Sequence, residues 1–300
     1  MTKCPIASSS SGSKPEGAEL GGAASREPGS PRAVAVIPAR LASTRLARKM
    51  LLAETGQALV VHTALNAARC PALERVIVAT DSPEIEGVVR AAGLEAVMTS
   101  PEHRSGTDRV REVLDSLEDG AWDVVLGLQG DEPDLAPRDL EQLVGAFCDQ
   151  SVEAATLCHP LADAEEAARP ELVKLVRDAR GRALYFSRAP IPAAAAHGTA
   201  SSGGVGHLGH IGVYAWRPAA LKRFCELPVG RLEQCECLEQ LRWLEAGESM
   251  LVLDATHRPR GIDTQRDYAA FVERTRTRDQ SSSPLPPTHS NPDTVRESTT

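Results

Sequence analysis

A run of basic and hydroxyl side chains follows the first apolar segment of the chain. Residues 33–37 form a short segment rich in Val and Ile that ends at Pro38, a pattern that predicts a buried parallel strand. The stretch after it carries Arg40, Ser43, Thr44, Arg45, Arg48 and Lys49. Because ligands of open α/β sheets bind at the carboxyl ends of strands, these side chains are placed to hold a polyanion.

The charge of the whole chain sharpens this interpretation. The formal net charge is -8, so the average field of the protein repels phosphates and nucleic acid. A local basic cluster in an acidic chain therefore indicates a defined anionic ligand and argues against nonspecific binding of nucleic acid. The alternative is that the cations are simply solvated in a polar loop.

Two aspartates each close an apolar, strand-like segment. Asp131 ends the run 123–131, and Asp263 follows Gly261 and Ile262. Both could project from the same edge of one sheet, and magnesium prefers one or two protein carboxylates together with phosphate oxygens and water. The pair therefore suits a metal–nucleotide complex, although either residue could instead cap a turn or a helix.

Three other patterns carry less weight. Residues 204–209 match the dinucleotide pattern Gly-x-Gly-x-x-Gly, but a Ser/Gly-rich loop precedes them and a strand follows, which is the wrong context. No Walker-type phosphate loop is present, so side chains must supply most of the phosphate contacts. His207 and His210 have no further ligand nearby, and Cys235 and Cys237 are too close for a Cys-x-x-Cys pair, so no zinc site is predicted.

Short apolar runs alternate with segments of helical spacing in the first half of the chain. We expect strands at 33–37, 75–81, 94–98 and 123–131 with helices between them, as in right-handed βαβ units. In the second half we expect a hairpin at 173–186, strands at 211–216 and 250–253, and helices at 221–227, 232–245 and from Thr264 to about 274. These elements predict an α/β fold with a mostly parallel central sheet, flanking helices and an antiparallel insertion.

Composition divides the chain into a folded body and two polar tails. Residues 1–31 and 278–300 are dominated by Ser, Pro, Gly, Ala and Thr, and they cannot bury enough apolar surface to offset the entropy of ordering. The body, 32–277, has a size ordinary for one α/β domain. No apolar run approaches the ~20 residues that span a bilayer, and no secretory signal is recognisable, so we expect a soluble, intracellular protein with reduced cysteines.

A series of motifs in the body resembles one enzyme family. The motifs are Pro38-Ala39-Arg40 with Ser43-Thr44-Arg45, Ala79-Thr80-Asp81, His103-Arg104-Ser105-Gly106-Thr107, Gln129-Gly130-Asp131-Glu132-Pro133, Tyr185-Phe186-Ser187-Arg188, His210-Ile211-Gly212-Val213-Tyr214, Leu238-Glu239-Gln240-Leu241-Arg242 and Gly261-Ile262-Asp263-Thr264. They occur in the order found in the 3-deoxy-manno-octulosonate cytidylyltransferases, also called CMP-Kdo synthetases. The resemblance covers nearly all of 33–275.

The resemblance implies a reaction and a set of partners. The family transfers the cytidylyl group of CTP to the sugar acid Kdo, and forms CMP-Kdo and pyrophosphate for lipopolysaccharide biosynthesis in the bacterial cytoplasm. It is similar in fold to the nucleotide-diphospho-sugar transferases, depends on Mg²⁺ and is usually a homodimer. The single domain would then contain a nucleotide-binding part, about 32–150, and a sugar-binding and dimerisation part, about 151–277.

Position by position, the resemblance also implies roles for residues of this chain. The triphosphate and cytosine would be held by Ala39, Arg40, Ser43, Arg45 and Lys49, and the nucleotide pocket would be completed by Thr80, Asp81, Arg104, Ser105 and Gly106. The sugar acid would be framed by Gln129, Arg188, His210, Tyr214, Glu239 and Gln240. Asp131 and Asp263 would bind the metal, and they would act in catalysis together with Arg40 and Lys49.

The chain departs from the family pattern in places that concern loops and sugar contacts. Ala47-Arg48 stands where the family commonly has Pro-Gly, and Gly209 stands where an arginine often precedes the histidine. Two alternatives therefore stay open. One is a cytidylyltransferase for another acidic sugar such as sialic acid, and the other is a noncatalytic nucleotide-binding relative.

Overall fold

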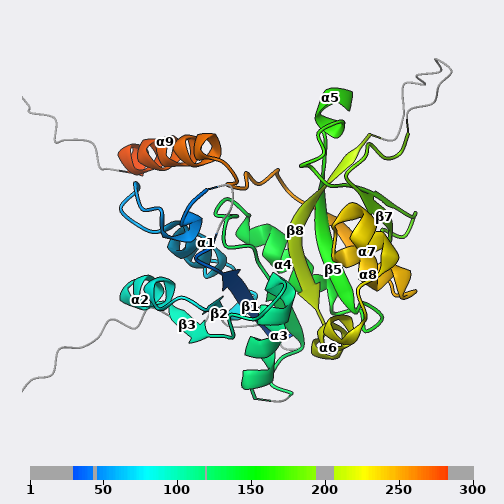
Figure 1. Cartoon of the computed structure of the whole chain (residues 1–300), viewed down its shortest axis with the longest axis horizontal. Helices are drawn as coiled ribbons and strands as arrows, with labels where there is room; N and C mark the ends of the chain where they lie inside the picture. The colour runs from blue at the N-terminus through cyan, green and yellow to red at the C-terminus, as the bar shows by residue number, and fades with distance from the viewer. Residues whose placement is uncertain (1–29, 43–45, 119, 194–205, 283–300) are drawn as a thin grey trace, which may run out of the picture.

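A nine-stranded mixed sheet forms the centre of the protein (Figure 1). The computed structural model describes residues 30–42, 46–118, 120–193 and 206–282. Within them the main strand order is β3-β2-β1-β4-β8-β5-β9, and β6 pairs with β7 and with β8 beside this path. The strands are β1 Ala33–Ala39, β2 Leu73–Thr80, β3 Glu95–Met98, β4 Val124–Gly127, β5 Ala154–Pro160, β6 Lys174–Arg177, β7 Ala183–Ser187, β8 Leu208–Trp216 and β9 Leu251–Asp254.

The sheet combines a parallel part with an antiparallel part. Strands β1 to β4 pair only in parallel with one another, whereas β8 runs antiparallel to β4, β5 and β6. The β6–β7 pair is the hairpin expected at 173–186. The predicted α/β architecture, with parallel strands in the first half and an antiparallel insertion in the second, is confirmed.

Helices cover both faces of the sheet because strands that are apolar on both sides must be shielded from water on each. One apolar cluster packs α1, α2 and α4 on one face, and a second packs α3, α6 and α8 on the other. In Figure 1, α9 lies beside α1 at one end of the molecule, and α6, α7 and α8 gather near β5 and β8 at the other. The bounds are α1 Leu59–Ala67, α2 Pro83–Ala91, α3 Gly106–Ser116, α4 Pro137–Ala146, α5 Ala164–Ala167, α6 Pro218–Glu226, α7 Arg231–Glu236, α8 Gln240–Glu245 and α9 Gln265–Ser282, with a 3₁₀ turn, η1, at Lys49–Leu51.

Most of the expected helix signals act as predicted. Ser82 caps α2 with Pro83 at its first position, and the Thr264 hydroxyl accepts a hydrogen bond from the Asp267 amide at 3.2 Å before α9. One expectation is wrong. The segment 232–245 is not one helix, because Cys237 takes the left-handed conformation, with φ 53°, and ends α7 before α8 begins.

Strand β5 and helix α4, which lie between the two halves, were not among the expected elements. Helix α9 also continues past the expected end near residue 274 to Ser282. In the part of the chain that the structure describes, no helix is both long enough and apolar enough to cross a membrane.

Candidate active site

An open cavity lies where the parallel strands end. In the register of the sheet Ala39 of β1 pairs with Thr80 of β2, and Val36 pairs with Gly127 of β4, so the loops after these strands emerge at one edge. The walls come from the segments that follow β1 and β4, the start of α3, strand β8 and the residue before α8. They include Ala39, Arg40, Lys49, Arg104, Ser105, Gly106, Thr107, Gln129, Asp131, Gly212, Tyr214 and Glu239.

The two aspartates singled out in the sequence converge on one cation. The Lys49 ammonium donates to Asp131 Oδ2, to Asp263 Oδ1 at 3.3 Å and to the Ile262 carbonyl at 2.8 Å. The backbone also ties the two segments together, because the Ile262 amide donates to the Asp131 carbonyl at 3.0 Å. Two carboxylates that are far apart in the chain thus face one point beside the cavity.

A third carboxyl group next to this cluster is neutral. Burial, reinforced by the charges of Asp131, Asp263 and Asp134, raises the pKa of Glu132 to about 8. Its Oε2 atom is buried and has no hydrogen-bond partner among the described residues. Gly261 lies against the same group, since a Cβ there would come within 2.9 Å of Glu132 Oε1. Glu132 therefore adds little negative charge at pH 7.

The start of α3 brings hydrogen-bond donors to the cavity. Ser105 caps the helix, and Ser105 and Asp108 form a reciprocal capping box. Gly106 eases a close approach, because a Cβ there would lie 3.1 Å from the Pro38 side chain. A helix that begins at the cavity presents amide groups and a partial positive charge, which suit a phosphate or a polar base edge.

The opposite wall presents less exposed polar groups. Glu239 accepts a hydrogen bond from the Thr107 hydroxyl, and burial raises the pKa of its carboxyl. Burial also raises the pKa of the Tyr214 phenol well above its usual value, so the ring is neutral. Gly212 leaves room for Gln129, since a Cβ there would lie 2.3 Å from Gln129 Nε2. The polar groups of this wall can form hydrogen bonds with the hydroxyl groups of a ligand, and none of them carries a positive charge.

Comparison with known proteins assigns this site to a family. A profile described as Cytidylyltransferase matches residues 34–250. A 3-deoxy-manno-octulosonate cytidylyltransferase of Nitratidesulfovibrio vulgaris (strain DP4) is 45% identical over 81% of this chain and 96% of its own, and one of Koribacter versatilis (strain Ellin345) is 42% identical over 84% and 93%. The chain belongs to the 3-deoxy-manno-octulosonate cytidylyltransferase family.

Solved structures agree with this assignment. A CMP:2-keto-3-deoxy-manno-octonic acid synthetase complexed with CTP is 39% identical, with a TM-score of 0.74, over 83% of this chain and 99% of that one. A 4-diphosphocytidyl-2C-methyl-D-erythritolsynthase from Anaerococcus prevotii DSM 20548 is 13% identical with a TM-score of 0.52, and shows only that the fold is shared. As a member of its family the chain is a nucleotidyltransferase.

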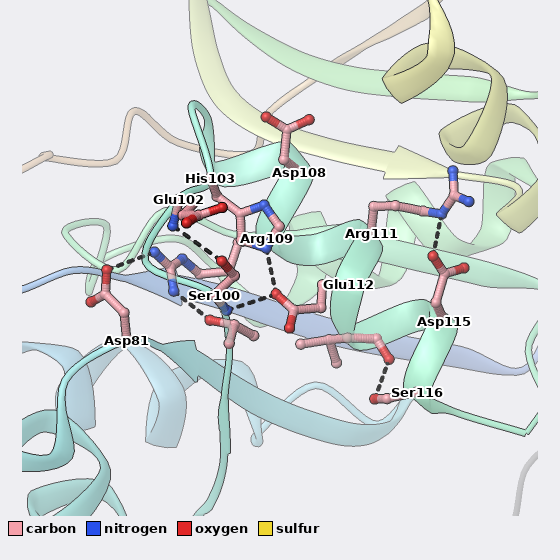
Figure 2. Close-up of polar contacts among 12 residues, drawn as sticks. Asp81, Ser100, Glu102, His103, Asp108, Arg109, Arg111, Glu112, Asp115 and Ser116 are labelled. Carbon is pink, nitrogen blue, oxygen red and sulfur yellow. Dashed lines mark hydrogen bonds and ion pairs between the residues drawn. The ribbon is translucent and has the colours of Figure 1, made fainter.

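In this cytidylyltransferase two of the expected nucleotide-pocket residues, Asp81 and Thr80, have structural partners. Figure 2 shows the contact of Asp81. Asp81 accepts a hydrogen bond from the buried Arg109 at 3.0 Å, and Arg109 also bonds the Thr99 hydroxyl. Thr80 is fully buried, and its hydroxyl accepts from the Ser82 amide at 3.1 Å. Neither Thr80 nor Asp81 lines the cavity, whereas Arg109 does. The sequence motifs did not single out Arg109, although it lies at the start of the amphipathic helix that was predicted.

Three of the expected sugar-side residues are not part of the lining of this cavity. The Arg188 guanidinium donates to the Glu236 carbonyl at 2.9 Å and to the Pro170 carbonyl at 3.1 Å. His210 pairs with the Thr156 hydroxyl at 2.9 Å, and burial lowers its pKa to about 3. Gln240 is 3% exposed. Their expected contacts with the sugar acid therefore stay predictions.

The basic loop is described only in part. Ser43 and Arg45 lie outside the described residues, so their expected contacts are not placed. Arg48 takes φ 53° where the family commonly has Gly, and its guanidinium pairs with Glu84 on α2. Lys49 keeps the expected position beside the cavity.

The neutral state of Glu132 predicts a pH-dependent stability. The folded protein should bind one more proton than the unfolded chain between about pH 4.5 and 8, so its free energy of unfolding should fall as pH rises through this window. Glu132→Gln is neutral at every pH and should lessen that fall, as measured by urea unfolding without divalent metal. Glu118→Gln, an exposed control, should keep the wild-type pH slope. Equal slopes in wild type and Glu132→Gln would contradict a protonated Glu132.

Proposed function

We propose that this enzyme transfers the cytidylyl group of CTP to Kdo, and releases pyrophosphate and CMP-Kdo, which would activate Kdo for lipopolysaccharide biosynthesis. The observation that carries the proposal is the convergence of Asp131, Asp263 and Lys49 beside the cavity. Nucleotidyl transfer brings together an anionic acceptor and a triphosphate, and a site with cationic groups and a pair of carboxylates suits that chemistry.

The proposed magnesium site rests on the chemistry of Asp131 and Asp263. Among the residues that the structure describes, no three His, Cys, Asp or Glu side chains are grouped to hold a metal ion. Two carboxylates are nevertheless a normal protein contribution for Mg²⁺, which takes its other ligands from phosphate and water. That both oxygens already face one cationic nitrogen supports the fit. When bound, the ion supplies neutralisation of phosphate charge and activation of the attacking hydroxyl.

The remaining chemistry falls to positioning and charge. The anomeric hydroxyl of Kdo attacks the α-phosphorus of CTP in line, and pyrophosphate leaves. Arg40, which is exposed at the cavity, and Lys49 would neutralise the charge that grows on the pyrophosphate. The amides at the start of α3 would hold the nucleotide, and Gln129, Tyr214 and Glu239 would orient the sugar acid.

A direct assay tests the reaction and the two alternatives. The purified protein mixed with CTP, Kdo and Mg²⁺ should release pyrophosphate, and in competition Kdo should be used in preference to sialic acid. A preference for sialic acid would reassign the sugar. Binding of CTP without any release of pyrophosphate would instead identify a noncatalytic nucleotide-binding protein.

Asp131 provides a test of the proposed metal ligands. Asp131→Asn keeps the shape of the side chain but removes its charge, and should lower turnover by about 10²-fold or more while leaving the thermal unfolding midpoint close to that of the wild type. Asp115→Asn, on the exposed side of α3 beside Arg111, removes the same charge away from the site and should leave turnover unchanged. Full activity in Asp131→Asn would rule out this assignment.

A cytoplasmic location and a homodimer are proposed from the family resemblance. One feature that suits an interface is Leu184 on β7, whose side chain is 61% exposed. Light scattering should give about twice the chain mass of 32.0 kDa. The mass of a single chain at micromolar concentration would contradict the dimer.

A further inference from the structure

The Lys49 ammonium uses all of its hydrogen-bonding capacity on the two aspartate segments. An ammonium has three donors, and here they meet Asp131 Oδ2, Asp263 Oδ1 and the Ile262 carbonyl. The side chain is 9% exposed, so water competes little for these contacts. In this arrangement Lys49 has no donor left for a phosphate.

The two carboxylates direct one oxygen each at the same nitrogen. Asp131 is only 16% exposed, whereas Asp263 is 47% exposed. A divalent cation bound between these two oxygens would need the space that the ammonium now fills. Two cations at such short range would also repel each other strongly. Lys49 and a metal therefore compete for one place.

Charge balance requires a cation between Asp131 and Asp263, whether or not a metal ion is bound. Asp131 and Asp263 each place an oxygen against one point, and like charges at close range are unfavourable without a counterion. Lys49 supplies that counterion when no metal is bound. Its long flexible stem allows the ammonium to move while the backbone at the start of η1 stays in place.

We propose that Lys49 and a divalent cation occupy the place between Asp131 and Asp263 in turn. Lys49 holds the carboxylates in the free enzyme, and it is released toward the phosphates when metal and nucleotide enter together. This inference rests on the proposed magnesium site. It makes Lys49 an internal competitor of the metal, which keeps metal affinity low until a nucleotide is present to accept the displaced ammonium.

Metal binding without nucleotide is the measurement that isolates this exchange. Mn²⁺ binding to the full chain is measured by electron paramagnetic resonance for the wild type, Lys49→Met and Lys49→Gln. Both variants should bind Mn²⁺ about tenfold or more tightly than the wild type, since a cation within a few ångströms shifts the cation affinity of a carboxylate by about that much. Added Mn²⁺ should also raise their thermal unfolding midpoint more than that of the wild type.

Two controls tie the effect to this position. Arg48→Met removes the same charge one residue away, where the side chain is 54% exposed and pairs with Glu84, so its Mn²⁺ affinity should stay close to that of the wild type. Adding Asp131→Asn to Lys49→Met should abolish the gain. An equal gain in Arg48→Met would mean that net charge alone is responsible, and would overturn the exchange.

The remaining outcomes separate the inference from the proposed function. Mn²⁺ binding to the wild type in the presence of CTP that is lost in Asp131→Asn would support the metal site. If the Lys49 variants then show no higher Mn²⁺ affinity than the wild type without CTP, the exchange is wrong and the metal site stands. If Asp131→Asn leaves Mn²⁺ binding with CTP unchanged, the metal site itself is wrong. A Lys49 variant that folds only with Mn²⁺ supports the exchange, and one that stays unfolded at every Mn²⁺ concentration overturns it.

Discussion

The site depends on holding Asp131 and Asp263 close together against their mutual repulsion. The fold meets this constraint with the Ile262–Asp131 backbone hydrogen bond, with the Lys49 ammonium and with a third carboxyl group that stays protonated. Each reduces the cost of concentrating acidic groups in a poorly hydrated place. The metal ion proposed for this site would use these two carboxylates as its protein ligands.

The remainder of the architecture supplies the edge at which this cluster forms. Parallel strands β1, β2 and β4 end at the same edge of the sheet, so the loops that follow β1 and β4 bring side chains from separate segments to one cavity. Small residues set how closely the walls approach: Gly106 lies against Pro38, and Gly212 lies against Gln129. The antiparallel strand β8 lines the cavity with Gly212 and Tyr214, so the parallel and antiparallel parts of one continuous sheet both contribute to its walls.

Local patterns predicted much of this arrangement. Short Val- and Ile-rich runs located β1 and β4, and their polar ends identified Arg40 and Asp131, which line the cavity. Gln129 also lines it, and was expected only from the family resemblance. What failed depends on long-range packing: the left-handed Cys237 that divides α7 from α8 has no local signal, since Gly or Asn is the usual residue there. Motifs also could not tell which side chains line this cavity, because Tyr214 lines it and His210 does not, although both belong to one motif.

Arg48 shows how the basic loop can vary between relatives. Its left-handed backbone, with φ 53°, is a conformation that favours glycine, and glycine is common there in the family. In this chain Arg48 directly precedes the η1 turn, and its guanidinium forms an exposed ion pair with Glu84. A cationic residue thus occupies this left-handed position, and the Lys49 side chain that follows it still lines the cavity.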